Sequence, residues 1–254
     1  MLRDTWLIFR RDMKAALRNP TWLMIGLAQP LMYLFFFGPL LVDMLKRGGL
    51  SDVDGWMLLT PALIAQLALF GSSFVGFGLL ADYRAGVVER FRVTPVSRVA
   101  LLLGKVLANS LQAVVQAAVI IVLAYLVFDL DAPFAGVLFS LLIVFLLAVT
   151  LSASSYALAL TLKSEETFPA FLNAVLMPLL LLSGILIPIT AGHAPAWLYT
   201  VSQINPFRHV VDVERSGFGG DFSMDALFTG SVVVLVMAAV SVWWGTRTFQ
   251  KDSA

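Results

Sequence analysis

The sequence predicts an all-α integral membrane protein with six transmembrane helices. Of its 254 residues, 59% are hydrophobic and only 13% are charged, and the mean hydropathy is +0.89. Soluble domains are about 45–50% apolar and about 25% charged, so this chain has too few polar side chains to cover a water-exposed surface. Its apolar residues gather in runs of about 20, the length that crosses the hydrocarbon core of a bilayer. The excess apolar surface must therefore face lipid.

Six segments have the length and composition of a membrane span. They are expected at residues 21–42, 57–80, 101–128, 134–162, 168–189 and 228–246. Lys105 is the only Asp, Glu, Lys or Arg among them, and it lies near one end of its span. No repeat, low-complexity tract or soluble domain interrupts the spans, so residues 1–254 are expected to form one domain.

The positions of the basic residues predict the orientation. Short cytoplasmic loops are enriched in Lys and Arg. With the N-terminus inside, thirteen of the 17 Lys and Arg residues fall on cytoplasmic segments and four on external ones. Six spans also place both termini on the same side. We therefore expect a multi-pass protein of the inner (plasma) membrane with cytoplasmic N- and C-termini.

Residues 1–20 are expected to form an amphipathic helix at the membrane interface. Apolar side chains recur there every three or four residues, while the basic ones fall mostly on the other side. This pattern is typical of a helix that lies in the headgroup region. The alternative is a charged lead-in to the first span that only sets the topology.

The cytoplasmic loop at residues 81–98 is longer than a simple reversal of the chain requires. It alternates charged residues with Val and Phe, and Pro95 disfavours helix at Thr94. A short amphipathic helix across the membrane face, suited to docking into a soluble partner, fits this pattern. From the residues alone, a loop that contacts only lipid headgroups fits equally well.

The external connection at residues 182–223 is long but not hydrophilic, and Pro188, Pro195 and Pro206 divide it into short pieces. We expect two short re-entrant helices within residues 190–217, because irregular backbone at membrane depth must be buried in protein or line a cavity. A plain extracellular loop that caps the bundle is the alternative.

Two stretches of the sequence resemble the ABC-2 type transporter permeases, particularly exporters of the daunorubicin-resistance type. The first is ERFRVTPVSRVALLLGKVLA at 89–108. The second comprises LMPLLLLSGILIP at 176–188, PAWL at 195–198 and NPFRHVVDVER at 205–215. One departure is Arg84, which stands where related sequences often have an acidic residue two positions before the glycine. Span count, order of motifs and length agree over essentially the whole chain.

The resemblance implies that two such permeases, identical or paralogous, form a dimer on two separately encoded ATP-binding-cassette subunits. Loop 81–98 would then be a coupling helix that contacts the ATPase through Arg84, Gly86, Glu89, Arg90, Arg92, Thr94 and Pro95. The re-entrant helices would form an extracellular gate that includes Pro188, Trp197, Asn205, Pro206 and Asp212.

The chain lacks the phosphate-binding loop G-x-x-x-x-G-K-[ST], because Val follows Gly104-Lys105 and the first glycine is absent. We expect this chain to bind no cofactor and to have no catalytic residues, with ATP and Mg²⁺ held by the partner subunit. His193 and His209 lack the spacing of a metal site, and the span serines lack a base. Ion-coupled transport is disfavoured because a coupling side chain within the spans is missing. A net charge of +1 suggests no nucleic-acid partner.

The cargo is predicted from side chains within the spans. Candidate residues for the substrate path are Gln66, Phe70, Phe74, Asn109, Gln112, Gln116 and Asn173. An apolar interface with a few amides suits a hydrophobic or amphipathic drug, antibiotic or lipid, so drug export, efflux and antibiotic resistance are the expected context. The alternatives are an exporter of polysaccharide or glycolipid, and a membrane scaffold or assembly subunit that binds a soluble partner without moving cargo.

Overall fold

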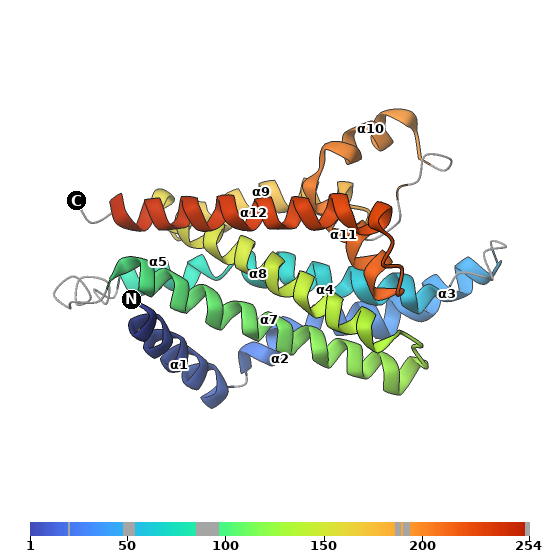
Figure 1. Ribbon diagram of the computed structural model, residues 1–254, viewed down its shortest axis with the longest axis horizontal. Helices are drawn as coiled ribbons and strands as arrows, with labels where there is room; N and C mark the ends of the chain where they lie inside the picture. Colours follow the sequence, from blue (N-terminus) through green and yellow to red (C-terminus); the bar gives the residue numbers. More distant parts are fainter. Residues whose placement is uncertain (20, 48–53, 85–96, 186–188, 190–193, 252–254) are drawn as a thin grey trace.

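The computed structural model describes residues 1–19, 21–47, 54–84, 97–185, 189 and 194–251, and these residues form helices and connections without a β-strand. The predicted all-α class is confirmed. The helices run mostly along one long axis (Figure 1). Residues 48–53, 85–96, 186–188 and 190–193 lie outside the description.

Five segments are long and apolar enough to cross a membrane: Leu23–Met44, Gly55–Ala81, Arg98–Phe128, Phe134–Leu162 and Leu227–Lys251. The first contains parts of α2 (Thr21–Met32) and α3 (Gly38–Arg47) with the π-helix η1 (Tyr33–Phe37) between them. The others correspond to α4 (Gly55–Ser73) with α5 (Gly76–Arg84), α7 (Arg98–Phe128), α8 (Phe134–Leu162) and α12 (Met224–Lys251). Five of the six expected spans are thus found near their predicted positions.

The span expected at 168–189 is a shorter helix. It is α9 (Thr167–Leu182), with 16 residues, which at 1.5 Å per residue is about 24 Å long against a hydrocarbon core of about 30 Å. Three helices complete the description: α1 (Leu2–Arg18), α10 (Ala196–Ile204) and α11 (Pro206–Phe218).

Side-chain caps and left-handed residues fix where several helices begin and end. The carboxylate of Asp54 accepts from Trp56 N–H at 3.0 Å, and the Ser97 hydroxyl accepts from Ala100 N–H at 3.2 Å. Such N-caps satisfy backbone donors that have no partner within the helix. At the other ends, Asp129 and Lys163 adopt φ of 51° and terminate α7 and α8.

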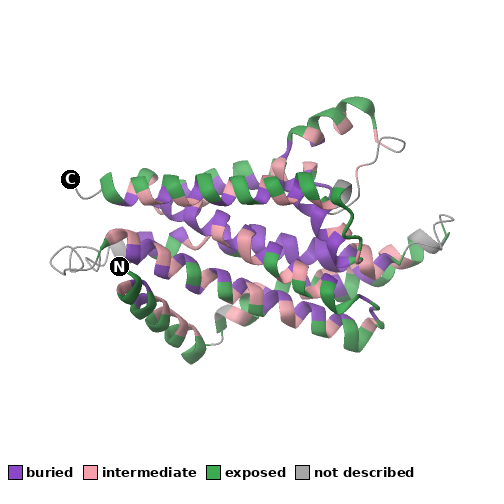
Figure 2. Cartoon of the chain, viewed as in Figure 1, coloured by how far each residue is buried: buried purple, intermediate pink, exposed green. Residues whose placement is uncertain are grey.

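The core lies along α4 and α8, and the outer helices are exposed. In the most apolar stretch of each span, 67% of α4–α5 residues are buried, against 22% for the first span and 17% for α12 (Figure 2). The first span and α12 therefore face lipid or a partner. Gly104 of α7 lets α1 approach closely, since a Cβ there would lie 2.8 Å from Ile8.

The two ends of the molecule carry different elements. Both termini, the end of α5 and the beginning of α7 lie at one end, and α3, α10 and α11 lie at the other (Figure 1). The described residues on either side of segment 85–96 therefore lie at the end that holds both termini, called the terminal end below. The hairpin of α10 and α11 is at the opposite end.

Candidate functional site

The residues predicted to contact an ATPase fall mostly outside the description. Gly86, Glu89, Arg90, Arg92, Thr94 and Pro95 belong to segment 85–96, and Arg84 is the last residue of α5. What the structure does give is the support on both sides of this segment, formed by α5, α7 and α1.

Helix α1 packs on α7 through one stripe and exposes the rest. Thr5 and Ile8 are buried, while Trp6 is 61% exposed and stacks on Phe9 with ring centroids 5.2 Å apart. The predicted amphipathic helix therefore exists, and it is attached to the beginning of α7. Its basic side chains Arg3, Arg10 and Lys14 are exposed, which is the arrangement of a helix at an anionic surface.

Helices α4 and α5 are separated by a break at Phe74 and Val75, and a side chain of α8 supplies hydrogen-bond partners to the backbone there. The Ser155 hydroxyl accepts from Gly76 N–H at 2.8 Å and donates to Ser73 O at 2.5 Å. Both backbone groups have lost helical partners at the break and would be costly to bury unpaired. The break thus fixes where α5, which leads into segment 85–96, departs from the line of α4.

Several of the predicted substrate-path residues lie within the helix bundle. Asn109 donates to Ser72 Oγ at 3.2 Å and to Ser152 Oγ at 2.6 Å, and so links α7 to α4 and α8. Gln66 and Gln116 are 2% and 5% exposed. Phe70, Phe74 and Gln112 are half-buried and Asn173 is exposed.

Three pockets are lined by other residues. One of about 220 Å³ lies where α8, α9 and α12 meet, with Ser154, Phe171 and Trp244 in its wall, and one of about 390 Å³ separates Trp6 of α1 from Leu107 of α7. The largest of the three, about 570 Å³, follows the first span; its lining residues are Ile25, Ala28, Gln29, Met32, Tyr33, Phe36 and Phe37.

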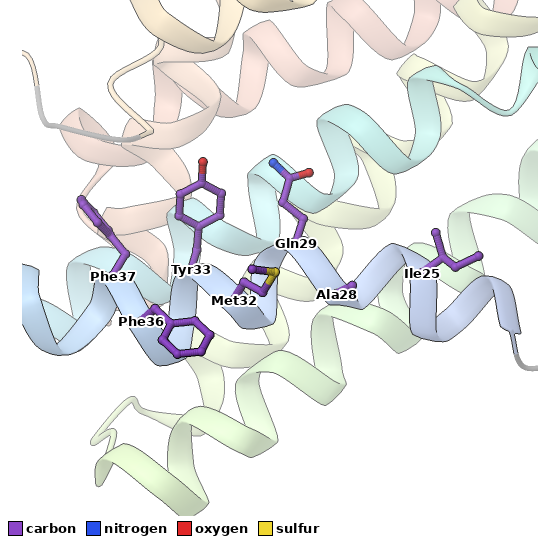
Figure 3. A pocket seen from close by; sticks show the side chains of 7 residues that line it. All are labelled: Ile25, Ala28, Gln29, Met32, Tyr33, Phe36 and Phe37. Carbon is purple, nitrogen blue, oxygen red and sulfur yellow. The ribbon is translucent and has the colours of Figure 1, made fainter.

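The π-helix shapes this largest pocket. Gly38 N–H bonds to Tyr33 O, five residues back, and Pro39 has no N–H for the next helical bond. The wider turn brings aromatic residues together with an amide, and Figure 3 shows Gln29, Tyr33 and Phe37 pointing to the same side of the segment. Single π-turns within helices are frequent at functional sites. Gln29 and Tyr33 were not among the predicted path residues, and the Gly38-Pro39 pair after three phenylalanines is the sequence signal for them.

At the opposite end, α10 and α11 form a hairpin joined at Asn205 and Pro206. The Asn205 side chain accepts from Phe207 N–H at 3.0 Å as the N-cap of α11, and it donates to Leu179 O of α9 at 2.8 Å. Pro206 occupies the first helical turn, where its missing N–H costs nothing. Two predicted gate residues thus form the corner of the hairpin and connect it to α9.

The other predicted gate residues are more peripheral. Trp197 is 68% exposed on α10. Asp212 pairs with Arg208 at 3.5 Å, and Arg208 also donates to Ser202 and lies 4.8 Å from the Tyr199 ring centroid. Pro188 lies outside the described residues.

Two neighbouring residues of α11 carry contacts that the sequence did not reveal. Arg215 donates to Gly184 O at 2.9 Å and to Ile185 O and Leu58 O at 3.3 Å, so it joins α11 to α4 and to the end of α9. Burial lowers the Arg215 pKa to about 10, while Asp212 acts in the opposite direction. Glu214 is fully buried and accepts from Ser140 of α8.

Among the described residues, no group of three His, Cys, Asp or Glu side chains lies close enough to hold a metal ion. His209 Nε2 lies 3.0 Å from Gln203 O, a local contact within the hairpin. The fold and these contacts define a multi-pass helical membrane protein, with an amphipathic helix at one end and a buttressed helical hairpin at the other.

Comparison with known proteins gives the family. The model of the ABC-2 type transporter family matches residues 3–218, and the chain belongs to that family. It is 27% identical over 193 residues to an Escherichia coli K12 protein named "Probable multidrug ABC transporter permease YbhR", a match that covers 75% of this chain and 51% of that protein. The chain thus spans about half the length of this relative.

A second relative comes from Cyanophora paradoxa. Its protein named "Putative transport permease ycf38" is 25% identical over 215 residues, covering 84% of this chain and 73% of that protein. The ycf38 protein of Porphyra purpurea is 24% identical over 226 residues, with 89% and 76% covered. These similarities extend beyond the two predicted motif regions to most of the spans.

Proposed function

We propose that the chain is the membrane-spanning permease subunit of an ATP-driven exporter. The observation that carries the proposal is the arrangement at the terminal end, where α5 and α7 lead into and out of segment 85–96 beside the basic helix α1. A soluble ATPase that binds segment 85–96 would act directly on α5, and α5 is held to α8 through Ser155. The chain itself would bind no nucleotide, so ATP and Mg²⁺ would be held by two copies of an ATP-binding-cassette subunit.

In this proposal α9 provides the sixth crossing, and both termini are cytoplasmic. Helix α9 is too short to span alone, but the backbone continues through Ser183, whose hydroxyl accepts from Ile185 N–H at 3.2 Å. Bonds from Arg215 and Asn205 to carbonyls at this end of α9 supply partners that the helix lacks. The crossing would therefore be completed by non-helical backbone buried in protein.

The cargo is proposed to be a hydrophobic or amphipathic drug, antibiotic or lipid-like molecule. The pocket at η1 offers Tyr33, Phe36 and Phe37 with Gln29 as a polar point, a mostly apolar lining with few polar groups, as ligand sites usually have. It opens on the weakly buried first span. A second permease, identical or paralogous, packed on this face would turn the open pocket into a chamber between two copies.

The hairpin of α10 and α11 is proposed to be the gate on the external side. It lies opposite the proposed ATPase contact, and Asn205 and Arg215 connect it to α9 and α4. A movement of α4 or α9 would therefore be transmitted to the hairpin. The proposed gate includes Asn205, Pro206 and Asp212, with Arg215 added from the structure.

A defined experiment tests the coupling site. The permease would be co-purified with the ATP-binding-cassette subunit of its own host, and ATP hydrolysis would be measured with and without amphipathic compounds. Glu89→Ala should keep the complex assembled and reduce the stimulation of hydrolysis several-fold. The control Glu166→Ala, an exposed residue that precedes α9, should leave stimulation unchanged. Equal stimulation in the wild type and Glu89→Ala would contradict the coupling role.

The scaffold alternative predicts a different result. A scaffold would bind the ATPase, and hydrolysis would proceed without transport of any compound. An exporter of polysaccharide or glycolipid would instead respond to carbohydrate-bearing compounds and not to amphipathic dyes. The aromatic pocket with a single amide at η1 favours the amphipathic cargo over a polyhydroxylated one, which would need many polar partners.

A further inference from the structure

Glu214 occupies a tightly packed position between helices. It is 0% exposed, and among the described residues it is the only Asp, Glu, Lys or Arg that is buried. Glycines on the neighbouring helices allow the close approach. A Cβ on Gly136 of α8 would lie 2.7 Å from Gly217 O, and one on Gly230 of α12 would lie 2.5 Å from Val213 Cβ. The last two turns of α11 are thus wedged between α8 and α12.

The carboxyl group is only half satisfied in this position. Ser140 Oγ of α8 donates to its Oε1, and Oε2 has no hydrogen-bond partner among the described residues. A buried carboxylate with one partner is far more costly than a neutral acid. Burial raises the Glu214 pKa well above its ordinary value, and the bond from Ser140 offsets part of the shift.

In the part of the chain that the structure describes, no cation forms an ion pair with this carboxyl. Helices α4 and α9 contain no ionisable residue, and Tyr156 of α8 lies about four turns from Ser140. Arg247 and Lys251 lie in the last turns of α12, at the far end of that helix, and Asp225 is its second residue. The ring of Tyr199 on α10 contacts Arg208. Within α11, His209 bonds to Gln203 O and Arg215 to the carbonyls of α4 and α9, and Asp212 is exposed and pairs with Arg208.

We propose that Glu214 is a proton-binding latch of the hairpin, which holds α11 between α8 and α12 when protonated and releases it when ionised. The inference rests on the proposed role of α10 and α11 as the external gate. On release, the proton passes from the carboxyl to water, and the bond from Ser140 breaks. The stabilisation of the docked hairpin is fully present below the ordinary carboxyl pKa and is lost as pH rises through the raised pKa. Between these two pKa values, the equilibrium between docked and released α11 shifts toward release by about tenfold per pH unit.

A cysteine reporter measures the release directly, because the natural chain has no Cys. Val210→Cys places a thiol on α11, one turn before Glu214, at a position that is 0% exposed. Labelling by a membrane-impermeant thiol reagent would be followed in proteoliposomes from about pH 5 to 8. The same reporter with Glu214→Gln, which stays neutral, corrects for the pH dependence of the reagent. Asp221→Asn, an exposed acid on the same side, is the matched control.

The labelling rate relative to the Glu214→Gln protein should rise by up to about tenfold per pH unit, and Asp221→Asn should behave like the wild type. Ser140→Ala should move the dependence to higher pH. A constant ratio at all pH values overturns the latch. If the Glu214→Gln protein does not accumulate, the Ser140→Ala variant provides the test. A labelling profile that rises at the same pH in Ser140→Ala as in the wild type would then overturn the latch. Labelling needs neither ATP nor cargo, so loss of transport with an intact pH profile would contradict only the exporter function.

Discussion

Arg215 shows how a single side chain connects the hairpin to the spans. Its guanidinium donates to three backbone carbonyls, Leu58 O of α4 and Gly184 O and Ile185 O after α9. The planar group with several fixed donors can reach all three, whereas a lysine ammonium is a compact point charge. The carbonyls after α9 also carry the partial negative charge of a helix end, which favours a cation there.

Arg215→Lys should therefore destabilise the protein although it keeps the charge. Hydrogen bonds to charged groups contribute about 1.5–3 kcal/mol each, and we expect a loss of about 2 kcal/mol because lysine keeps part of the set. The measurement is thermal unfolding of the purified protein in detergent. The matched control is Arg47→Lys, at an exposed ion pair with Asp43, where an effect near zero is expected. Equal unfolding midpoints for Arg215→Lys and Arg47→Lys would contradict the role of Arg215 in holding α11 against α4 and α9.

At the residue scale, some of the site could be predicted from the sequence. Asn205 and Pro206 were predicted from the resemblance to the ABC-2 type permeases, and the structure shows that this pair begins α11 as its N-cap and first helical residue. Glu214 and Arg215 were not, because charged residues in an external connection are usually solvated, and only packing shows which side of α11 is buried. The predicted path residue Asn109 is an amide whose partners, Ser72 and Ser152, are distant in sequence.

At the scale of elements, the break between α4 and α5 depends on a glycine. A Cβ on Gly76 would lie 2.5 Å from Ser155 O and 2.8 Å from Phe168 Cζ. Alanine there would push α5 away from α8 and strain the bonds that Ser155 makes to the break. Gly78, two residues further along α5, would have no atom within 4 Å of a Cβ.

We expect Gly76→Ala to destabilise the protein by about 1–3 kcal/mol, the usual cost of overpacking. Gly78→Ala should be neutral or stabilising by up to about 1 kcal/mol, because alanine favours helix more than glycine. Thermal unfolding of both variants checks the pair. A Gly76→Ala protein as stable as Gly78→Ala would mean that α5 is not held against α8 in the membrane.

The elements differ in how well their sequence predicts them. Long apolar runs such as α7 and α8 were predicted closely, because a span needs only length and hydropathy. The span at 168–189 ends early at Leu182, where Ser183 and Gly184 interrupt the helix. The π-turn at η1 was missed, since one additional residue in a turn leaves the apolar run unchanged.

At the scale of the whole molecule, topology is the first property to test. Single cysteines at Asp131, Glu166 and Phe222 would report the connections after α7, α8 and α11, and these three positions are exposed. With the N-terminus inside and α9 crossing, an impermeant reagent added to intact cells should label positions 131 and 222 but not 166. With the N-terminus inside, labelling of 131 alone, with 166 and 222 both protected, would show that α9 does not cross.

The central claim is that ATP hydrolysis by a partner drives export through this chain. The most direct measurement is uptake of daunorubicin and other amphipathic fluorescent dyes into inverted membrane vesicles that contain the chain and the ATP-binding-cassette subunit of its host. We predict uptake that requires ATP and both subunits and falls several-fold with Glu89→Ala. Uptake that persists without the ATPase subunit, or ATP hydrolysis by the complex without uptake of any compound, would contradict the account.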